Sequence, residues 1–461
     1  MRSRSLLILL AVVVVLGAFI ALWERHQPSS DERAEAADRV LPALDPDDIR
    51  EVRIEGGAEV VRLVRSGETW SLESPLKFAA DSSRVNTLLT TLDNLEADRR
   101  LDPDEVEGSD YGLAEPAYRV TLVGPDNEET VLSVGEETAL GSNRAVQIAG
   151  DDEIAIVSGW FLSDLDRPVD DWRSRDVVDV FADQLASLEV LRLGDTVRVV
   201  RVGDQWRLLA PLNDLADRDH VRNVISDLNA LRIEEFVDGD VDLAAMGLDA
   251  PEVQVMLIRS QGDEPVRLEF GATRTVDGAT QVACRRGDFD VFWVNDVARI
   301  RLTKAPVLWR SPEVWPFDTW AVDRLELAAD DDTVVVDRGT GGWTLKDGGS
   351  ADSAAVQERL SALAALEATA FDLVQPVTSE RGRVTLGFEA GDDGEPTDSV
   401  ELVFYRPLVA GGDAMVTVSG RPTVMSVPSE AVETVLADPA GLRVPADDAN
   451  ATDDDGGPDA S

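Results

Sequence analysis

A twelve-residue phrase occurs twice in this chain. WSLESPLKFAAD begins at Trp70 and WRLLAPLNDLAD begins at Trp206, with Trp, Leu, Pro, Leu, Ala and Asp in the same places. The match continues beyond the phrase, because apolar residues recur at the same spacing after both aspartates. Self-similarity at a fixed period is the sign of a tandem repeat. The chain therefore has to fold as a series of similar copies rather than around one continuous core.

Each phrase leads into a predicted helix. The apolar residues that follow the two phrases are Val85, Leu88, Leu89, Leu92 and Leu95, then Val221, Val224, Ile225, Leu228 and Leu231. This spacing is typical of one buried helical face. Asp81 and Asp217 stand where an N-cap carboxylate accepts from first-turn amides. A third, shorter version of the phrase opens at Trp343, and Asp352 precedes the same kind of apolar stripe.

Further motifs recur in the first two copies. YGLAEP returns as MGLDAP, and Trp172-Arg173 returns as Trp309-Arg310 at the ends of the copies. We predict that these Trp-Arg pairs pack one copy against the next, with Arg over an indole face. Because the repeated Trp positions start strands beside Leu, we predict that they are core residues. The positions predicted to be structural are Trp70, Asp81, Gly112, Pro116, Trp206, Asp217, Gly247, Pro251, Trp343 and Asp352.

The repeats predict three units, at residues 46–178, 182–315 and 320–443, the third divergent. Alternating strands such as IREVRIE and EVVRLVR come first, a capped helix follows, and more strands complete the unit. This order predicts an α+β unit with a mostly antiparallel sheet and one principal packed helix. A length of 461 residues suits about two to four domains. Residues 445–461 are acidic without apolar residues beyond alanine, and we predict a disordered tail there.

An unbroken apolar run, Leu6 to Leu22, lies near the start of the chain. Extended to residues 5–23, it is long enough to cross a bilayer as a helix. Arg2 and Arg4 precede it, so the positive-inside rule leaves residues 1–4 in the cytoplasm. Residues 24–45 then form a tether, and the remainder lies outside the cytoplasmic membrane. The predicted fold is thus a single N-terminal transmembrane helix followed by three α+β repeats. A cleaved signal peptide stays open as the alternative, and it would export the same residues.

The charge balance excludes one class of partner. The chain holds 43 Lys and Arg against 89 Asp and Glu, a net charge of −46. Nucleic-acid binding needs clustered basic residues, so we expect no nucleic-acid partner. Solubility and adaptation to high salt both explain the acidity, since net charge concerns solubility rather than fold. The single cysteine, Cys284, lies in an apolar alternation and is predicted to be a buried small side chain.

Residues that could carry chemistry are few. Neither His26 nor His220 has a His or Cys companion at ligand spacing, which excludes a zinc site and a His-based triad. Nucleophile-elbow, P-loop and dinucleotide-binding motifs are absent from the sequence. We therefore predict no enzyme, and no catalytic, cofactor or metal residue.

One acidic stretch, Asp238-x-Asp240-x-Asp242, begins like a calcium-binding loop. Leu243 stands where that loop needs Gly, and Asp249 stands where it needs Glu. We expect a solvated loop rather than a calcium site.

The combined pattern resembles a known family. W-x-L-x-x-P, then Ala-Asp opening a helix, then Y-G-L-x-x-P and a strand ending in Val-Gly, resembles the bacterial family catalogued as domain of unknown function number 4340. The resemblance covers the first two copies well and the third poorly. Members commonly look like accessory partners of ABC-type export or gliding-motility-like transporter components. The resemblance therefore implies a membrane-protein partner, an ABC-type transporter or its auxiliary subunit, and it carries over no catalytic residue.

Three functions stay open at this point. A membrane-tethered extracytoplasmic scaffold fits the apolar run, the repeats and the missing catalytic motifs, and it is the function we expect. A cell-wall or glycan-binding ectodomain would need Trp side chains exposed in a groove. A carboxylate-based hydrolase would need two acids facing each other across a cleft.

Overall fold

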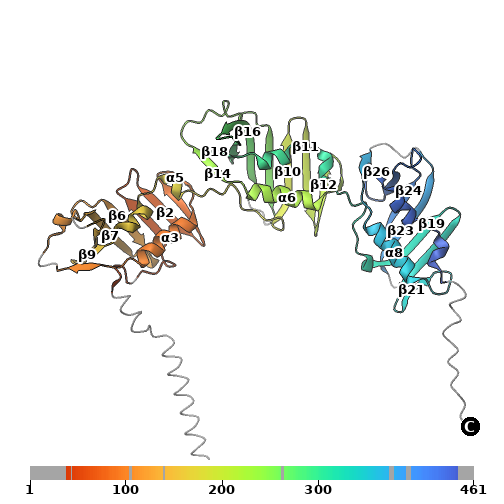
Figure 1. Cartoon of the computed structure of the whole chain (residues 1–461), viewed down its shortest axis with the longest axis horizontal. Helices are drawn as coiled ribbons and strands as arrows, with labels where there is room; N and C mark the ends of the chain where they lie inside the picture. Colours follow the sequence, from red (N-terminus) through yellow and green to blue (C-terminus); the bar gives the residue numbers. More distant parts are fainter. Residues whose placement is uncertain are drawn as a thin grey trace, which may run out of the picture. The chain divides into compact units, whose positions relative to one another are not determined.

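A computed structural model describes residues 38–42, 44–102, 106–138, 141–260, 264–372, 378–390 and 396–444. The chain divides into two compact units, Met1–Arg175 and Asp176–Ser461, called here the N-terminal and the C-terminal unit. The N-terminal unit holds the first repeat copy, and the C-terminal unit holds the second and third copies (Figure 1). Each copy is built on one antiparallel sheet.

The first sheet has the strand order β4-β3-β2-β1-β6-β7-β8-β9-β5. Its strands are β1 (Glu51–Glu55), β2 (Val61–Ser66), β3 (Thr69–Ser74), β4 (Phe78–Ala79), β5 (Arg99–Leu101), β6 (Tyr118–Val123), β7 (Glu129–Glu137), β8 (Arg144–Ile148) and β9 (Ile154–Val157). The principal helix, α3 (Ser82–Asp93), packs its apolar stripe on one face of this sheet. The short turn η3 (Gly159–Phe161) and helices α4 (Leu162–Leu165) and α5 (Val169–Trp172) complete the copy.

The second sheet repeats this order as β13-β12-β11-β10-β15-β16-β17-β18-β14. Its strands are β10 (Leu185–Arg192), β11 (Asp195–Val202), β12 (Gln205–Ala210), β13 (Asp214–Leu215), β14 (Ile233–Val237), β15 (Val253–Arg259), β16 (Val266–Val276), β17 (Ala279–Arg286) and β18 (Asp290–Asn295). Its principal helix is α6 (Arg218–Asn229), followed later by α7 (Val297–Leu302) and the short turn η4 (Pro306–Trp309). The two sheets therefore have the same topology, as the repeated phrase requires.

The third sheet is a shorter version, with the order β21-β20-β19-β23-β24-β25-β26-β22. Its strands are β19 (Val322–Ala329), β20 (Asp332–Gly339), β21 (Gly342–Leu345), β22 (Ala370–Asp372), β23 (Glu380–Ala390), β24 (Pro396–Tyr405), β25 (Ala414–Val418) and β26 (Val424–Val427). Its helices are α8 (Ser353–Ala364) and α9 (Ser429–Val435), with short turns η5 (Thr319–Ala321) and η6 (Pro439–Leu442). The described residues thus form three antiparallel sheets with related strand orders.

An aspartate begins each principal helix. Asp81 accepts from the backbone N–H of Arg84, and Asp217 and Asp352 each accept from two first-turn amides. These bonds satisfy helix N–H groups that have no partner within the helix. The buried residues of α3 include Val85, Leu88, Leu89 and Leu92, and α6 buries the corresponding set. Apolar spacing and capping therefore act together to place one helix on each sheet.

The predicted fold class is wrong in its balance and is corrected by the structure. Strands far outnumber helices among the described residues, and each copy is organised by a broad antiparallel sheet, with only one helix of twelve residues on it. Very short strands such as β4 and β5 cannot be recognised from hydrophobic alternation, which is why the sheet content was underestimated.

The predicted fold also includes a transmembrane helix. In the part of the chain that the structure describes, no helix is long and apolar enough to cross a membrane. The predicted span at residues 5–23 lies outside the described residues, as does the predicted tail at 445–461.

Short arms open and close every copy. An opening arm forms an isolated bridge with the segment after the principal helix, at Arg39 with Glu96 in the first copy. The same bridge joins Asp176 with Arg232 and Glu313 with Glu367 in the later copies. Val40 and Leu41 of the first arm are buried, so this part of the predicted tether (24–45) belongs to the first core.

The Gly-Leu-x-x-Pro motif packs against the sheet in each of the first two copies, where Leu113 and Leu248 join small buried clusters. Gly112 and Gly247 have positive φ values of 72° and 65°, which favour glycine. A Cβ on Gly135 would lie 2.0 Å from the carbonyl oxygen of Tyr111, so β7 approaches the motif backbone directly. The paired glycines in this motif and in the Val-Gly strand are thus required by backbone packing.

Candidate functional site

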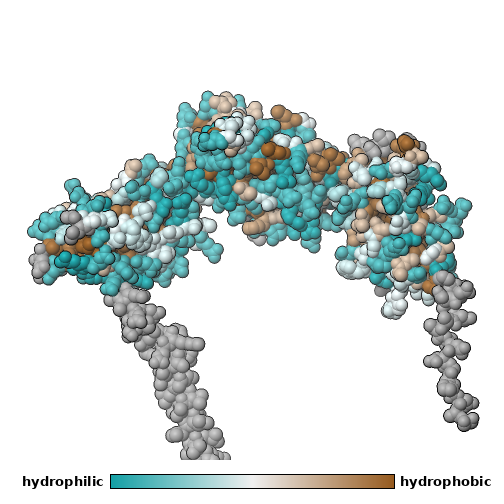
Figure 2. All heavy atoms as spheres, viewed as in Figure 1, coloured by the Kyte–Doolittle hydropathy of each residue, from teal (hydrophilic) through white to brown (hydrophobic). Residues whose placement is uncertain are grey.

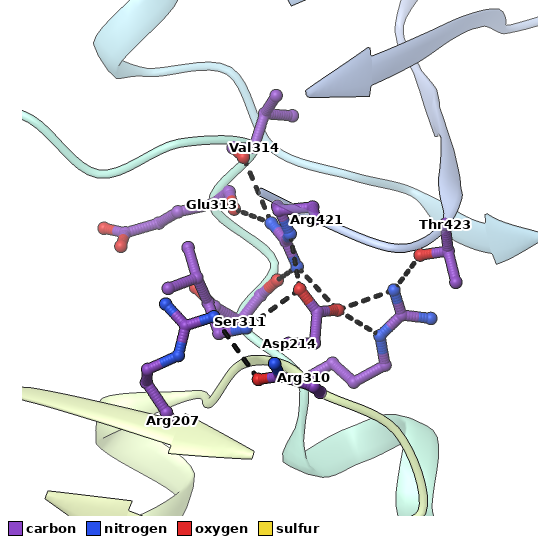
Figure 3. Close-up of polar contacts among 10 residues, drawn as sticks. Arg207, Asp214, Arg310, Ser311, Glu313, Val314, Arg421 and Thr423 are labelled. Atoms are coloured by element: carbon purple, nitrogen blue, oxygen red, sulfur yellow. Dashed lines mark hydrogen bonds and ion pairs between the residues drawn. The ribbon is translucent and has the colours of Figure 1, made fainter. Parts of the chain in front are cut away.

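Among the residues that the structure describes, three buried charged side chains gather in the C-terminal unit, where the second and third copies meet (Figure 3). Asp214, on the two-residue strand β13, is 0% exposed. Arg310, which follows η4, and Arg421, in the hairpin between β25 and β26, both form ion pairs with it. We call Asp214, Arg310 and Arg421 the joint cluster. In this cluster one arginine from the second copy and one from the third bind the same carboxylate.

All five N–H groups of the Arg421 guanidinium have acceptors. Nε donates to Asp214 Oδ1 over 2.7 Å, and Nη2 donates to Asp214 Oδ2 and to the carbonyl oxygen of Ser311. Nη1 donates to the carbonyl oxygens of Glu313 and Val314. Buried guanidinium groups are tolerated only when their donors are satisfied in this way. Arg421 therefore binds both the second copy and the arm that opens the third.

Arg310 completes the cluster from the second copy. Its Nε donates to Asp214 Oδ2 over 2.7 Å, and its Nη2 donates to the hydroxyl of Thr423. Its guanidinium carbon lies 3.9 Å from the ring centroid of Phe371 on β22, a cation–π contact. Both Thr423 and Phe371 belong to the third copy, so Arg310 also crosses between the two copies.

The electrostatics of the cluster favour a permanently charged carboxylate. Burial alone would raise the pKa of Asp214, but hydrogen bonding from Arg421 and the charges of Arg421 and Arg310 hold it below its usual value. Burial lowers the pKa of Arg310, against the opposing charge of Asp214. A carboxylate that is enclosed by two arginines and stays ionised is suited to holding two surfaces together, and it is poorly suited to proton transfer.

The corresponding positions in the other copies differ. In the first copy the place of Asp214 is taken by Phe78, and the guanidinium carbon of Arg173 lies 4.4 Å from its ring centroid. In the third copy Arg443 forms an exposed ion pair with Asp347. An arginine thus stands at the end of each of the three copies. Of these three arginines, Arg310 of the second copy is the one that pairs with a buried carboxylate.

An arginine also holds the opening arm of each copy. Arg421 does so for the third copy, and Arg286 donates to the carbonyl oxygens of Asp176 and Val177 in the second. In the first copy Arg100, on β5, donates to the carbonyl oxygen of Arg39. Arg100 and Arg286 pair with acids of their own copies, Glu153 and Asp290. Arg421 instead pairs with Asp214 of the preceding copy, which makes its arm contact a joint between copies.

A groove of about 580 Å³ lies beside the joint cluster. Its walls come from the start of α6, the third copy's opening arm and the end of α8. The charged side chains that line it are Asp204, Asp217, Arg218, Asp219, Arg222, Glu313, Asp318 and Glu367. The groove is therefore predominantly acidic, with two arginines on one wall.

The structure places the repeated tryptophans inside the sheets. Trp70, Trp206 and Trp343 are 2%, 6% and 7% exposed, and their carbonyl oxygens accept from the residue that precedes each N-cap aspartate. Trp172 and Trp309 are fully buried in their own copies, where their carbonyl oxygens accept from the N–H groups of Asp81 and Asp217. These two tryptophans close their own copies, whereas Arg310 reaches the next one.

The remaining predicted positions take no part in the joint. Gly112, Pro116, Gly247 and Pro251 lie in the motif loops that cover the first and second sheets. His220 contacts the ring of Trp309 edge-on, at 4.8 Å between centroids. Cys284 is buried, and burial raises the pKa of its thiol.

The acidic stretch from Asp238 to Asp242 lies in the loop that follows β14. Among the described residues, no group of three or more His, Cys, Asp or Glu side chains could hold a metal ion.

Sequence reasoning missed Asp214 and Arg421. Asp214 falls inside the repeated phrase, at the position where the first copy has Phe78, and this difference between copies was the available signal. Arg421 lies in a hairpin of the divergent third copy, where no motif marks it.

Comparison with known proteins identifies the repeat. The model of the family described as Domain of unknown function (DUF4340) matches residues 70–251 and, in a second overlapping match, residues 206–383. No curated protein matches the chain.

Proposed function

The chain belongs to the DUF4340 family, and we propose that it is a non-enzymatic scaffold that holds a membrane-protein partner at the outer face of the cytoplasmic membrane. The observation that carries this proposal is the joint cluster. Both arginines pair with Asp214 where the second copy meets the third, and the side chains of Asp214 and Arg421 are fully buried. A buried cluster of this kind favours one arrangement of two surfaces over others, which is the property that a scaffold needs.

The groove beside the joint supports a role in partner binding. It is lined by both copies, so its shape depends on the joint, and its exposed acids and arginines are suited to charged groups on a protein surface. A partner that binds across the groove would contact two copies at once. Its affinity would then depend on the joint holding both copies in place, because pre-organised surfaces lose less entropy on binding.

The proposed location rests on the sequence. Leu6 to Leu22 is apolar and follows Arg2 and Arg4, which favours a location at the cytoplasmic membrane with the three copies outside. Confinement to a membrane raises the effective concentration of neighbouring membrane proteins, so modest contacts suffice for binding. The proposed partner is an ABC-type transporter or its auxiliary subunit, and this identification rests on the family resemblance.

Affinity purification tests the proposal. The tagged full-length protein is purified in mild detergent, and the proteins that accompany it are identified by mass spectrometry. We expect a transporter component to be enriched over an unrelated single-span protein purified in the same way. Its enrichment should fall in Asp214→Asn, which loses the buried charge, and should persist in Asp347→Asn, which removes an exposed pair.

Two results would count against the scaffold. Recovery of the protein with no membrane component above the control would remove the partner. Equal enrichment with wild type and Asp214→Asn, when the variant has a demonstrably opened joint, would separate partner binding from the joint.

A further inference from the structure

A groove in the N-terminal unit differs in chemistry from the rest of this acidic chain. It has a volume of about 450 Å³ and runs along the outer side of α3 to Trp160 on η3. The lining side chains are uncharged, and they include Ser83, Asn86, Thr87, Thr90 and Asn94. Figure 2 shows pale, weakly polar surface over the part of the N-terminal unit where Figure 1 places α3. We propose that this groove binds a neutral oligosaccharide.

Trp160 supplies an exposed aromatic surface. Its side chain is 56% exposed, whereas the repeated tryptophans are buried. The backbone around it is fixed, because Phe161 is fully buried and a Cβ on Gly159 would lie 2.0 Å from the carbonyl oxygen of Ser142. An exposed indole on a fixed backbone stacks on the apolar face of a sugar ring at little cost in conformational entropy, because only two side-chain torsions have to be ordered.

The helix supplies hydrogen-bonding groups of both kinds. The hydroxyls of Thr87 and Thr90 donate to backbone carbonyl oxygens of α3, so their oxygens remain acceptors. Asn86 Oδ1 accepts from the indole N–H of Trp70, which directs the amide and leaves its nitrogen as a donor. Sugar hydroxyls both donate and accept, so this mixture suits them. From Ser83 to Asn94 the helix rises about 17 Å, enough for a short oligosaccharide.

The second copy provides an internal comparison. By the repeat alignment, Val297 takes the place of Trp160 and is also 56% exposed. The α6 positions that match Ser83 and Asn86 are Asp219 and Arg222, which form an ion pair. The same place in the fold therefore carries charges and no aromatic ring. The uncharged groove is a property of the first copy, and it is not required by the repeat.

The contact between the principal helix and the helix after the last strand also differs between the first two copies. In the first copy the hydroxyl of Thr91 donates to Asp164 over 3.0 Å. In the second copy the matching contact joins Arg301 with Asp227 as an ion pair. Both contacts hold the principal helix to the helix that follows the last strand. In the first copy the helix contributes a neutral hydroxyl to this contact, and the carboxylate of Asp164 is balanced by an ion pair with Arg167.

Binding of neutral oligosaccharides tests the proposal directly. The full-length protein, in mild detergent, is applied to an array of short oligosaccharides of glucose, galactose, mannose and N-acetylglucosamine, and the strongest hit is titrated by calorimetry. We expect Trp160→Ala and Thr90→Arg each to weaken binding at least tenfold. Trp320→Ala, which removes an indole that is 73% exposed on the third copy, should change binding less than twofold. Thermal melting checks that all variants are folded.

The proposal is overturned if wild type binds none of these oligosaccharides, or if Trp160→Ala binds them as wild type does. Protection of Trp160 by a co-purified protein, with no oligosaccharide bound, would assign the groove to protein docking. These outcomes are independent of the scaffold, because the purification experiment depends on Asp214 and the array depends on Trp160.

Discussion

Replacing Asp214 with Asn should open the joint between the second and third copies. The change keeps the size of the side chain and removes its charge, leaving Arg310 and Arg421 buried together. Their side chains are 4% and 0% exposed, so water cannot replace the lost carboxylate. Removing one partner of a buried charge cluster costs about 3–5 kcal/mol. We expect a loss of this size in the free energy that holds the joint closed.

Hydrogen exchange measures this opening at identified amides. The N–H of Val314 donates to the carbonyl oxygen of Leu366, and the N–H of Ala368 donates to that of Pro312, so both amides report on the third copy's opening arm. Since each 1.4 kcal/mol is a factor of ten, exchange there should accelerate by at least about a hundredfold. Amides of the first sheet, in the N-terminal unit, should keep their wild-type rates.

A matched control uses a pair that water reaches. Asp219 and Arg222 form an ion pair with side chains 80% and 57% exposed, and Asp219→Asn should alter stability by less than about 0.5 kcal/mol. If Asp214→Asn left the exchange of Val314 and Ala368 within a factor of three of wild type, the cluster would not hold the joint. The second and third copies would then not form a rigid pair.

Three further predictions concern the copies themselves. Trp206→Ala should destabilise the second copy by about 3–5 kcal/mol through lost burial and a cavity, measured by urea unfolding; unchanged stability would show that the side chain is not in the core. Gly135→Ala should cost about 1–3 kcal/mol, because the new Cβ meets the carbonyl oxygen of Tyr111, whereas Gly57→Ala, whose nearest neighbour is 3.9 Å away, should have little effect. Burial, with the charges of Arg301 and Lys304, lowers the pKa of His220, so its contribution to stability is present above the usual value of 6.5 and is lost as the pH falls from there toward the folded-state pKa. His220→Gln should flatten the fall in melting temperature over that range, and an identical pH profile would contradict the assignment.

The repeat could be predicted from the sequence, because the residues that define it act within a single copy. A Trp at a strand start, an Asp before an apolar stripe and a Gly in a tight motif each act through neighbours in the same copy. The three N-cap aspartates lie where the pattern placed them. Strands of two or three residues escaped prediction, since their pairing is decided by the neighbouring strand rather than by their own composition.

The contacts between copies could not be predicted in the same way. Asp214 and Arg421 are far apart in the chain, and their pairing depends on how one sheet end meets the next hairpin. Trp160 escaped notice because it falls in the segment SGWFLSDL and is not part of any repeated motif. Local sequence patterns indicate the packing within a copy. Differences between copies at matching positions indicate the contacts or binding surfaces that are specific to one copy.

Photo-crosslinking in intact cells tests the scaffold most directly. A photoreactive amino acid replaces Arg222, which lines the groove beside the joint cluster, and in a parallel strain it replaces Asp288, which does not line that groove. We expect a crosslink from position 222 to one membrane protein, weak or absent from position 288, and strongly reduced when Asp214→Asn is added. Crosslinks from position 222 that match those from position 288, or that persist unchanged with Asp214→Asn, would contradict the scaffold.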